Sequence, residues 1–482
     1  MCGCSSSNSI IDLNKTITSI SRINTSIYFD RYSKKGDYTK KYEFISKIGN
    51  GSFGKVRLYR DRKIQSMKYA IKTIKKNIFN IYSITNALKE IEILRSLDHP
   101  NIVKYFETYE DDLYLHIIME YIPGDNLFKM LSNKQKINFS EKDINEIMLY
   151  LMKAILFLHH NGIIHRDIKP ENILFSIKGE YSSLKLIDFG LSTNFNSKRE
   201  KYSVGTPYYM SPEMLEGKYY FKSDMWSIGV ILYMIVTGSY PFNGRNKNEI
   251  FKMIYEGNYN IQKLDEQNCS YQLKNLIKKS LIKDINKRIS IEDALNCDWF
   301  KLFSSKKNDN LIISYDIIKA LKNFQSHNIL QKEILYYFAK ISNDSEINKL
   351  KKAFSLIDKN NSGEIEYEEI RKIFKDLNIN TNEDELKRIF NSLDFHNDGK
   401  VNYSEFIAAT LSSIKFVIKE RLSSAFQYFD IDNSGFITLD SVIKALIQNN
   451  ITIDIEALKK IFKGKRSKMD FLEFTKIFYE KN

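Results

Sequence analysis

Residues 165–172 read HRDIKPEN, and they are followed by DFG at 188–190 and by GTPYYMSPE at 205–213. Each stretch, taken alone, is compatible with an ordinary polar loop. Upstream of them a glycine cluster lies at 49–54, and a lysine, Lys72, stands inside a short apolar run. Because chance does not assemble such features in one order, we interpret them together as parts of a single domain.

The glycine cluster lies between two strand-like runs. A GxGxxG pattern alone is weak, because dinucleotide-binding folds use the same spacing. Here the glycines are followed by the strand-like run 56–59 and not by a helix, which predicts a flap between two antiparallel strands. Glycines let backbone N–H groups approach phosphate oxygens closely. The candidate nucleotide-binding residues of this flap are Ile48, Gly49, Asn50, Gly51, Ser52, Phe53, Gly54, Lys55 and Val56.

Lys72 ends the run YAIK at 69–72. A lone lysine is more often a surface residue, so a partner is needed. Glu90 lies on a segment whose apolar residues recur at helical spacing, whereas Glu92 lies about 200° around that helix from Glu90. We therefore predict a pair between Lys72 and Glu90, and we add Ala70 to the candidates for the nucleotide site.

The whole motif series resembles that of the eukaryotic protein kinases over residues 42–300. The resemblance implies an α+β, two-lobed protein kinase fold that uses ATP and Mg²⁺. It implies that Asp167 accepts the proton of the substrate hydroxyl and that Lys169 reaches the transferred phosphoryl group. The lysine at 169 and the GTP sequence at 205–207 resemble serine/threonine kinases rather than tyrosine kinases.

The resemblance also implies how metal and phosphates are held. Asn172 and Asp188 supply hard oxygen ligands for Mg²⁺, which bridges the phosphates. Lys72, oriented by Glu90, holds the α- and β-phosphates. Phosphoryl transfer depends on positioning and charge neutralisation more than on covalent catalysis, which suits these residue types.

The hinge between the lobes resembles MEYI at 119–122, with Met119 at the gatekeeper position. Backbone groups of Glu120 and Ile122 are the candidate contacts to adenine. Asn126 departs from the family, since many relatives have a glutamate there that contacts ribose and a basic residue of the substrate. A strong preference for arginine before the phosphorylated residue is therefore in doubt, although Glu171 can supply part of it.

Two further positions receive no chemistry. Ser211 replaces the usual alanine before Pro212 and Glu213, which is a small change. Glu213 and Arg288 are expected to form a buried structural pair.

Beyond residue 257 the glycines are at 363, 399, 435 and 464, with spacings of 36, 36 and 29, which indicates an internal repeat. The first copy, 358–369, matches a 12-residue EF-hand calcium loop throughout. Side-chain oxygens stand at positions 1, 3 and 5, a glycine at 6, a carbonyl at 7 and a bidentate glutamate at 12. The predicted ligands are Asp358, Asn360, Ser362, Glu364 and Glu369, and the alternative is an acidic turn between helices.

The later loops match the EF-hand ligand pattern progressively less well. The second, 394–405, has the candidate ligands Asp394, His396, Asp398, Lys400 (through its carbonyl) and Glu405, and His396 is a poor ligand for a cation that prefers oxygen. The third offers Asp430, Asp432 and Ser434, but Ser441 occupies position 12. The fourth has Phe462, Gly464 and Arg466 at the first three ligand positions and Glu473 at its end, so we predict a metal-free EF-hand.

A kinase domain, a helical junction and four EF-hands in this order resemble the calcium-dependent protein kinases. This resemblance implies that the junction, 301–343, blocks the kinase at low calcium and is bound by the EF-hand domain, 344–482, when calcium rises. The junction has apolar residues at helical spacing with Lys319, Lys322 and Lys332 among them, as in a helix recognised by calmodulin. A rigid helical spacer is the alternative.

The N-terminal tail, 1–41, is polar. Gly3 follows Cys2, so removal of Met1 would not expose a glycine for myristoylation. Cys2 and Cys4 are candidate palmitoylation sites that would bring the protein to a membrane, and a disordered tail is the alternative. Four cysteines in 482 residues do not make a disulfide framework, and no secretory signal or long apolar run occurs, so we expect a cytoplasmic protein with protein substrates.

The net charge of +14 comes from the first 340 residues, since the remainder holds 23 acidic and 22 basic residues. The charges are scattered rather than clustered, which disfavours a nucleic-acid interface. Two rival functions are a calcium-sensing scaffold with an inactive kinase fold and a kinase regulated by a separate calmodulin-like protein. Intact Lys72, Asp167, Asn172 and Asp188 argue against the first, and the attached EF-hands make the second unnecessary.

Overall fold

The computed structural model describes most of the chain: residues 33–50, 54–76, 81–132, 139–195, 204–303, 313–413, 418–432, 434–448, 455–462 and 468–479. Several predicted positions lie outside these ranges, namely Cys2, Cys4, Gly51, Ser52, Phe53, Gly464 and Arg466. The described residues fall into two compact units. The first comprises residues up to 97 together with 103–122 and 188–193, and the second comprises 98–102, 123–187 and the chain from 194 onward.

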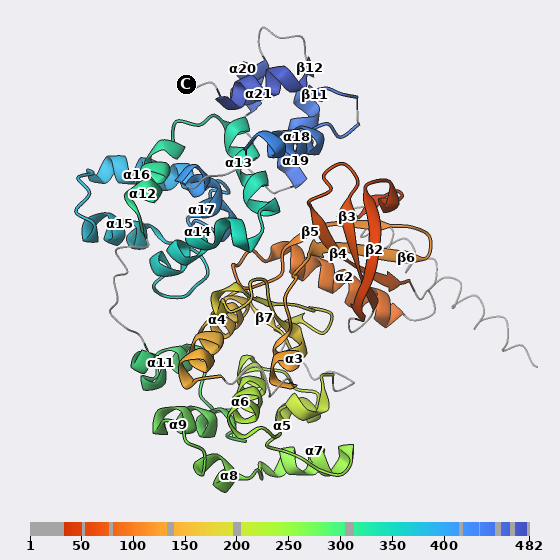
Figure 1. Ribbon diagram of the computed structural model, residues 1–482, viewed down its shortest axis with the longest axis vertical. Helices are drawn as coiled ribbons and strands as arrows, with labels where there is room; N and C mark the ends of the chain where they lie inside the picture. The colour runs from red at the N-terminus through yellow and green to blue at the C-terminus, as the bar shows by residue number, and fades with distance from the viewer. Residues whose placement is uncertain are drawn as a thin grey trace, which may run out of the picture. The chain divides into compact units, whose positions relative to one another are not determined.

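The first unit is a six-stranded sheet with one long helix, drawn in red and orange in Figure 1. Its strand order is β1-β5-β6-β4-β3-β2, and all neighbours are antiparallel except β1 and β5. β4 alternates little and is buried on both faces, as its apolar run predicts. The elements are β1 (Lys34–Lys35), β2 (Tyr42–Asn50), β3 (Gly54–Asp61), β4 (Lys68–Lys75), α2 (Ile81–Ser96), β5 (Tyr105–Glu110) and β6 (Tyr114–Glu120).

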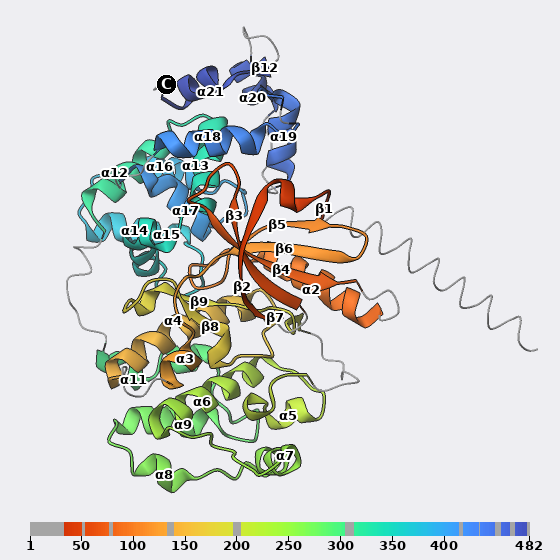
Figure 2. The ribbon, with the colours of Figure 1, turned by 45° about the vertical axis from the view of Figure 1, so that its right-hand side comes forward.

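Residues before the expected domain start at 42 belong to this sheet. β1 pairs in parallel with β5, and the two strands lie side by side in Figure 2. Lys34 and Lys41 place their Nζ atoms 2.7 and 2.8 Å from the carboxylate of Glu107, which also accepts a hydrogen bond from the hydroxyl of Tyr42. The sequence did not predict this strand, because the tail is polar and two consecutive lysines show no alternation of apolar and polar residues. The predicted boundary at 42 therefore leaves out a strand of the first unit.

We predict that Glu107→Gln lowers the free energy of unfolding by about 2–3 kcal/mol at neutral pH. Although burial raises the pKa of Glu107, the ammonium groups of Lys41 and Lys34 outweigh it and lower the pKa to about 2. A carboxyl group with a lowered pKa stabilises the fold above its unfolded pKa, so this contribution should be lost as pH falls from about 4.5 towards 2. Urea unfolding at pH 7 and pH 3 tests this, with the exposed Asp112→Asn as control. Equal losses of stability for both variants at pH 7 would contradict it.

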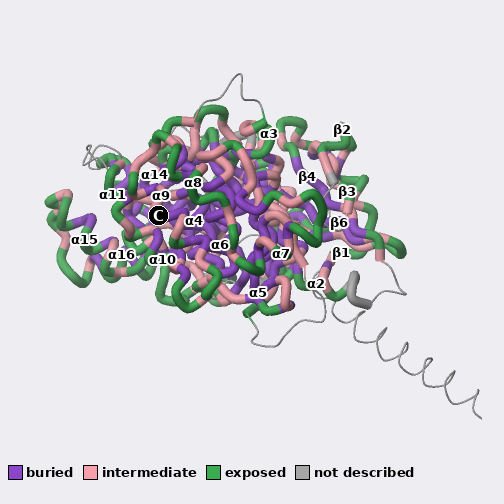
Figure 3. The backbone as a smooth tube through the Cα atoms, turned by 90° about the horizontal axis from the view of Figure 1, so that it is seen from below, coloured by how far each residue is buried: buried purple, intermediate pink, exposed green. Residues whose placement is uncertain are grey.

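Up to residue 303, the second unit is mainly helical. α4 begins with a capping box, in which the side chains of Ser140 and Asp143 each accept a hydrogen bond from the other's backbone N–H. Figure 3 shows α4 and α6 largely buried, and Trp226 of α6 and Trp299 are fully buried in this unit. The helices are α3 (Leu127–Ser132), α4 (Glu141–His160), α5 (Pro212–Leu215), α6 (Phe221–Thr237), α7 (Lys247–Glu256), α8 (Ile261–Asp265), α9 (Tyr271–Ser280), α10 (Ile291–Leu295) and α11 (Asp298–Phe303).

Short strands shape the region of the HRDIKPEN sequence. β8 and β9 pair in antiparallel fashion, with Ile173 opposite Leu186. The strands are β7 (Ile163–Ile164), β8 (Ile173–Phe175), β9 (Leu184–Leu186) and β10 (Thr193–Asn194), and the 3₁₀ helices are η2 (Pro170–Asn172), η3 (Tyr181–Ser183) and η4 (Pro207–Tyr209).

The rest of the second unit consists of the junction and the EF-hands. The junction forms α12 (Tyr315–Phe324) and α13 (Ile329–Ile341), with 304–312 outside the described residues. The EF-hand helices are α14 (Asp344–Ile357), α15 (Tyr367–Asp376), α16 (Glu383–Leu393), α17 (Tyr403–Thr410), α18 (Ile418–Phe429), α19 (Leu439–Gln448), α20 (Ile455–Phe462) and α21 (Phe471–Tyr479).

The junction helices and the EF-hands share one apolar core. Leu321 and Phe324 of α12 and Ile334 and Phe338 of α13 are buried in the same cluster as apolar residues from the EF-hand helices. Figure 2 shows α13 beside α17 and α18. The loops pair as expected for EF-hands: Ile365 bridges Val401, and β11 (Ile437–Thr438) pairs with β12 (Lys468–Met469). The mixed sheet of the first unit and the helices of the second agree with the predicted α+β class.

Candidate functional site

A buried lysine lies between two carboxylates in the first unit. Lys72 Nζ is 2.5 Å from Glu90 Oε1 and 2.8 Å from Asp188 Oδ1, and the three side chains are 2%, 1% and 11% exposed. β4 supplies Lys72, α2 supplies Glu90, and Asp188 stands at a backbone φ of +63°. The predicted pairing of Lys72 with Glu90, rather than with Glu92, is what the structure shows.

Lys72, Glu90 and Asp188 form a triad whose charges do not balance. Burial lowers the pKa of Lys72, but the carboxylates of Glu90 and Asp188 outweigh it, so the pKa lies above its ordinary value. Burial raises the pKa of Glu90 even though Lys72 opposes this. Two carboxylates around one ammonium leave a surplus negative charge, and Oε2 of Glu90 is buried without a hydrogen bond within the described part of the chain. A divalent cation held by Asp188 would compensate that charge, so the residues fit Mg²⁺.

The strands on either side of the predicted flap, β2 and β3, pair in antiparallel fashion. Gly49 pairs with Val56, and Asn50 pairs with Lys55 across β2 and β3. A Cβ on Gly54 would collide with the carbonyl oxygen of Thr73 in β4, so glycine is required where β3 begins. The backbone at both ends of the flap is therefore fixed by the sheet, and Ile48 is partly exposed there.

The predicted adenine contacts lie on and just after β6. Ala70 pairs with Met119 in the sheet. The backbone N–H of Glu120 donates to the carbonyl of Lys104 at 2.9 Å. Ile122, two residues on, is buried. Sequence alone did not reveal that the N–H of Glu120 is used within the sheet.

The catalytic loop of the second unit centres on Asp167. Lys169 Nζ lies 2.7 Å from Asp167 Oδ2, and the hydroxyl of Thr206 donates to Asp167 Oδ1 at 2.7 Å. Lys169 also donates to Thr206 Oγ1 at 2.9 Å, and the amide of Asn172 donates to the carbonyl of Asp167 at 2.9 Å. Asp167, Lys169 and Asn172 are thus brought together as predicted, with the carboxylate held in one orientation.

Sequence reasoning missed two residues of this loop. In the sequence, Thr206 served only to indicate a serine/threonine kinase, although its hydroxyl donates a hydrogen bond to the carboxylate of Asp167. Asp224 on α6, 1% exposed, accepts hydrogen bonds from the backbone N–H groups of His165 and Arg166 at 3.1 and 3.0 Å and contacts His159 Nε2 at 2.9 Å. A charged residue inside the apolar sequence of α6 was the available signal.

Asn126, Glu213 and Arg288 have structural roles. Asn126 Oδ1 accepts a hydrogen bond from the N–H of Lys129 at 2.8 Å at the start of α3. Arg288 binds Glu213 with two hydrogen bonds of 2.7 and 2.9 Å. Burial raises the pKa of Glu213, but the Arg288 guanidinium and two serine hydroxyls outweigh it and hold the pKa below its usual value.

Hydrogen bonds within the first EF-hand loop hold its candidate ligands in place. Asp358 accepts hydrogen bonds from the N–H groups of Ser362 and Gly363 at 2.9 and 3.1 Å. Glu369 Oε1 accepts from the N–H of Lys359 at 2.7 Å, which links position 12 of the loop to position 2. Asn360 Oδ1 accepts from Ser362, whose hydroxyl donates to the carbonyl of Glu364. Burial raises the pKa of Asp358 to about 6. This set of carboxylate, amide, hydroxyl and carbonyl oxygens fits Ca²⁺.

In the second loop, the residue at position 3, His396, contacts the carboxylate at position 12. His396 Nδ1 lies 2.6 Å from Oε1 of Glu405, the residue at position 12, and that oxygen also accepts the N–H of Phe395 at 2.7 Å. Asp394 accepts the N–H groups of Asp398 and Gly399. The N–H of Lys400 donates to Asp398 Oδ1, and its ammonium pairs with Glu364 of the first loop at 2.7 Å. His396 therefore occupies the oxygen that a calcium ion would need.

The last two loops are incomplete. In the third, Asp430 and Asp432 both accept the N–H of Ser434, while the hydroxyl of Ser441 donates to the carbonyl of Thr438 at 2.8 Å. In the fourth, residues 463–467 lie outside the described ranges, and Glu473 accepts the N–H of Asp470 at 3.2 Å. Within the described residues, no three His, Cys, Asp or Glu side chains meet as a metal cluster.

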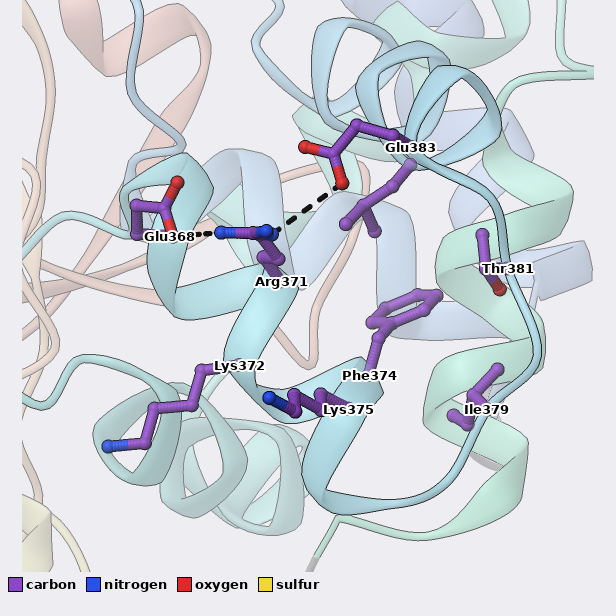
Figure 4. A pocket seen from close by; sticks show the side chains of 9 residues that line it. Glu368, Arg371, Lys372, Phe374, Lys375, Ile379, Thr381 and Glu383 are labelled. Carbon is purple, nitrogen blue, oxygen red and sulfur yellow. Dashed lines mark hydrogen bonds and ion pairs between the residues drawn. The ribbon is translucent and has the colours of Figure 1, made fainter.

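A cavity of about 390 Å³ lies between α15 and α16 (Figure 4). Phe374, Ile379 and Leu386 give it an apolar wall, and Arg371 at its edge pairs with Glu368 at 3.1 Å and Glu383 at 3.5 Å. From the junction, Lys322 of α12 lies 5.9 Å from the centre of the Phe374 ring and 3.5 Å from Glu385. The junction helix therefore packs beside this cavity.

Comparison with known proteins identifies the domains. Residues 42–300 match the protein kinase domain, 347–411 match an EF-hand domain pair, and 422–440 match an EF hand. The two units, with the triad in one and the catalytic loop in the other, thus define a protein kinase joined to EF-hands.

The chain is 39% identical over 339 residues to calcium-dependent protein kinase 4 of Plasmodium falciparum (isolate 3D7), covering 69% of this chain and 64% of that protein. It is 35% identical over 441 residues to calcium-dependent protein kinase 3 of Plasmodium berghei (strain Anka), covering 89% and 78%. The chain belongs to the calcium-dependent protein kinase family, as predicted. Membership implies ATP, Mg²⁺ and Ca²⁺ as ligands.

Where a membrane is concerned, no helix among the described residues has the length and apolarity needed to cross one.

Proposed function

We propose that this protein is a calcium-activated serine/threonine protein kinase that transfers the γ-phosphate of ATP to protein hydroxyls. The observation that carries the proposal is the set of contacts at Asp167, whose carboxylate is oriented by Lys169 and Thr206. An inactive, scaffolding kinase fold would have no need to keep this network together with the Lys72 triad. A phosphorylation assay with radiolabelled ATP, with and without calcium, tests the proposal.

In the proposed mechanism Asp167 accepts the proton of the substrate serine or threonine hydroxyl. Lys169 Nζ, already 2.7 Å from that carboxylate, is placed to stabilise charge on the transferred group. Lys72 holds phosphate oxygens and is kept in position by Glu90. Asn172 and Asp188 would hold Mg²⁺, which supplies neutralisation of phosphate charge.

The proposed activating ion is Ca²⁺ bound by the first EF-hand loop and more weakly by the second and third. We propose that the junction inhibits the kinase at low calcium and that the EF-hands bind it when calcium rises. The shared core of α12, α13 and the EF-hand helices supports the second part. Lys332 of α13 also donates to the carbonyl of Ser392 at 3.1 Å, and Lys322 pairs with Glu385.

If the junction is the inhibitor, a fragment ending at residue 303 should phosphorylate substrate without calcium and should not respond to a chelator. This fragment ends with α11 and so lacks both the junction helices and the EF-hands. Full-length protein, assayed with calcium and with chelator, is the matched control. A fragment that folds and binds ATP but is inactive would show instead that the EF-hand domain supports the active kinase.

We further propose a cytoplasmic location with peripheral membrane contact through acylated Cys2 and Cys4. Only the sequence supports this, since both cysteines lie outside the described residues. Metabolic labelling with a palmitate analogue tests it, with the Cys2→Ser, Cys4→Ser double variant as control.

A further inference from the structure

The first and second EF-hand loops share one backbone arrangement. In each loop the carboxylate at position 1 accepts the N–H groups of positions 5 and 6. The carboxylate at position 12 accepts the N–H groups of positions 2 and 3. Within the described chain, no three His, Asp or Glu side chains of either loop meet as a cluster. The two loops therefore differ less in their backbone than in the donor atom at each ligand position.

The side chain at position 3 sets the two loops apart. In the first loop this residue is Asn360, whose Oδ1 accepts the N–H of Ser362 at 2.9 Å. In the second it is His396, whose Nδ1 lies 2.6 Å from Oε1 of Glu405 and 3.2 Å from Nδ2 of Asn402. The second loop thus places an imidazole nitrogen against the carboxylate at position 12, where the first loop has an amide.

The imidazole of His396 is packed in this orientation. Its ring meets the ring of Tyr336 on α13 edge to face, with the ring centres 5.6 Å apart, and Tyr336 is buried. The side chains of His396 and Glu405 are 16% and 1% exposed. Because both groups are already fixed by their neighbours, they lose little freedom when they bind one ion.

The second loop also carries one more carboxylate at these positions than the first. Asp394, Asp398 and Glu405 stand at positions 1, 5 and 12, whereas the first loop has Ser362 at position 5. Together with His396 they make a mixed set of nitrogen and oxygen donors. Ca²⁺ is bound by oxygen ligands. Imidazole nitrogen suits Zn²⁺, which also binds carboxylate oxygens and needs fewer ligands than Ca²⁺ does.

We propose that the second EF-hand loop is a Zn²⁺ site that prefers Zn²⁺ to Ca²⁺, with Asp394, His396, Asp398 and Glu405 as its ligands. The nitrogen of His396 and the oxygen of Glu405, now in hydrogen-bond contact, would both bind the ion. The first loop has no imidazole and keeps its preference for Ca²⁺. The inference rests on the proposed function only in that both treat the EF-hand loops as metal sites.

Calorimetric titration of the full-length protein with Zn²⁺, at a calcium concentration that saturates the first loop, tests this. His396→Asn gives the second loop the position-3 residue of the first. It should weaken zinc binding at one site by at least about tenfold, because an amide is a poorer zinc ligand than imidazole, and it should strengthen calcium binding there. His160→Asn, which removes an exposed imidazole from the end of α4, is the control and should change neither.

Two further measurements keep the test decisive if His396→Asn does not fold. In the unaltered protein, NMR of the seven histidines should show one imidazole signal that shifts with Zn²⁺ and not with Ca²⁺. The reciprocal variant Asn360→His should weaken calcium binding by the first loop and strengthen its zinc binding.

Unaltered zinc affinity in a folded His396→Asn protein, or no imidazole signal that responds to Zn²⁺ in the parent, would overturn the inference. Failure of the proposed calcium site is a separate result, because that site depends on Glu369. If Glu369→Gln leaves calcium binding unaltered while zinc binding depends on His396, the calcium proposal fails and the zinc site stands.

Discussion

Asp167→Asn is expected to lower the rate of phosphoryl transfer by about 10²–10⁴-fold, the usual contribution of a positioned general base. The carboxylate of Asp167 is 3% exposed and is bonded on one oxygen by Lys169 and on the other by Thr206. Asparagine preserves the shape of the side chain but cannot accept a proton from the substrate hydroxyl. The loss should appear in kcat, because neither ATP nor the substrate backbone depends on this charge for binding.

The assay for Asp167→Asn is phosphorylation of a peptide at saturating calcium and ATP. The exposed Asp112→Asn is the matched control and should retain full activity. Thermal unfolding with and without ATP shows whether the variant still folds and binds nucleotide. Substantial turnover by a purified Asp167→Asn protein would contradict the role that we propose for this residue.

Glu369→Gln is expected to shift calcium activation to a concentration higher by about tenfold or more if the first loop dominates the switch. Glu369 stands at position 12, where a carboxylate binds calcium with both oxygens. In the structure its two oxygens already accept the N–H groups of Lys359 and Glu366, so the side chain is directed into the loop. An amide in its place loses a charge and one oxygen ligand.

The matched control for Glu369→Gln is Glu473→Gln, the same substitution at the same position of the fourth loop. It should have almost no effect, because the first three ligand positions of that loop carry no carboxylate. Calorimetry should count two or three sites in the parent protein and one fewer in Glu369→Gln. Four sites of similar affinity would show that loop position does not predict ligand strength in this protein.

Much of the candidate site could be predicted because its chemistry is local in sequence. The 12 residues of the first calcium loop and the HRDIKPEN stretch each contain their ligands within a few positions, where backbone geometry alone sets the distances. The Lys72–Glu90 pair was predictable for a similar reason, since helical periodicity selects Glu90 over Glu92. The kinase and EF-hand fold classes followed from these motifs and their order.

The contacts that orient these groups required the folded chain. Thr206 reaches Asp167 across 39 positions and Asp224 reaches the backbone of Arg166 across 58, and neither spacing follows any repeat. The strand at Lys34 has no strand-like sequence and is held by Glu107, a carboxylate 73 positions away. Ser404 and Asp98 are 306 positions apart. Such pairs depend on how buried surfaces pack, and packing is set by the shapes of many side chains at once rather than by a local pattern. The sequence was therefore sufficient for the motifs and their chemistry, whereas the surroundings of each motif were decided by tertiary packing.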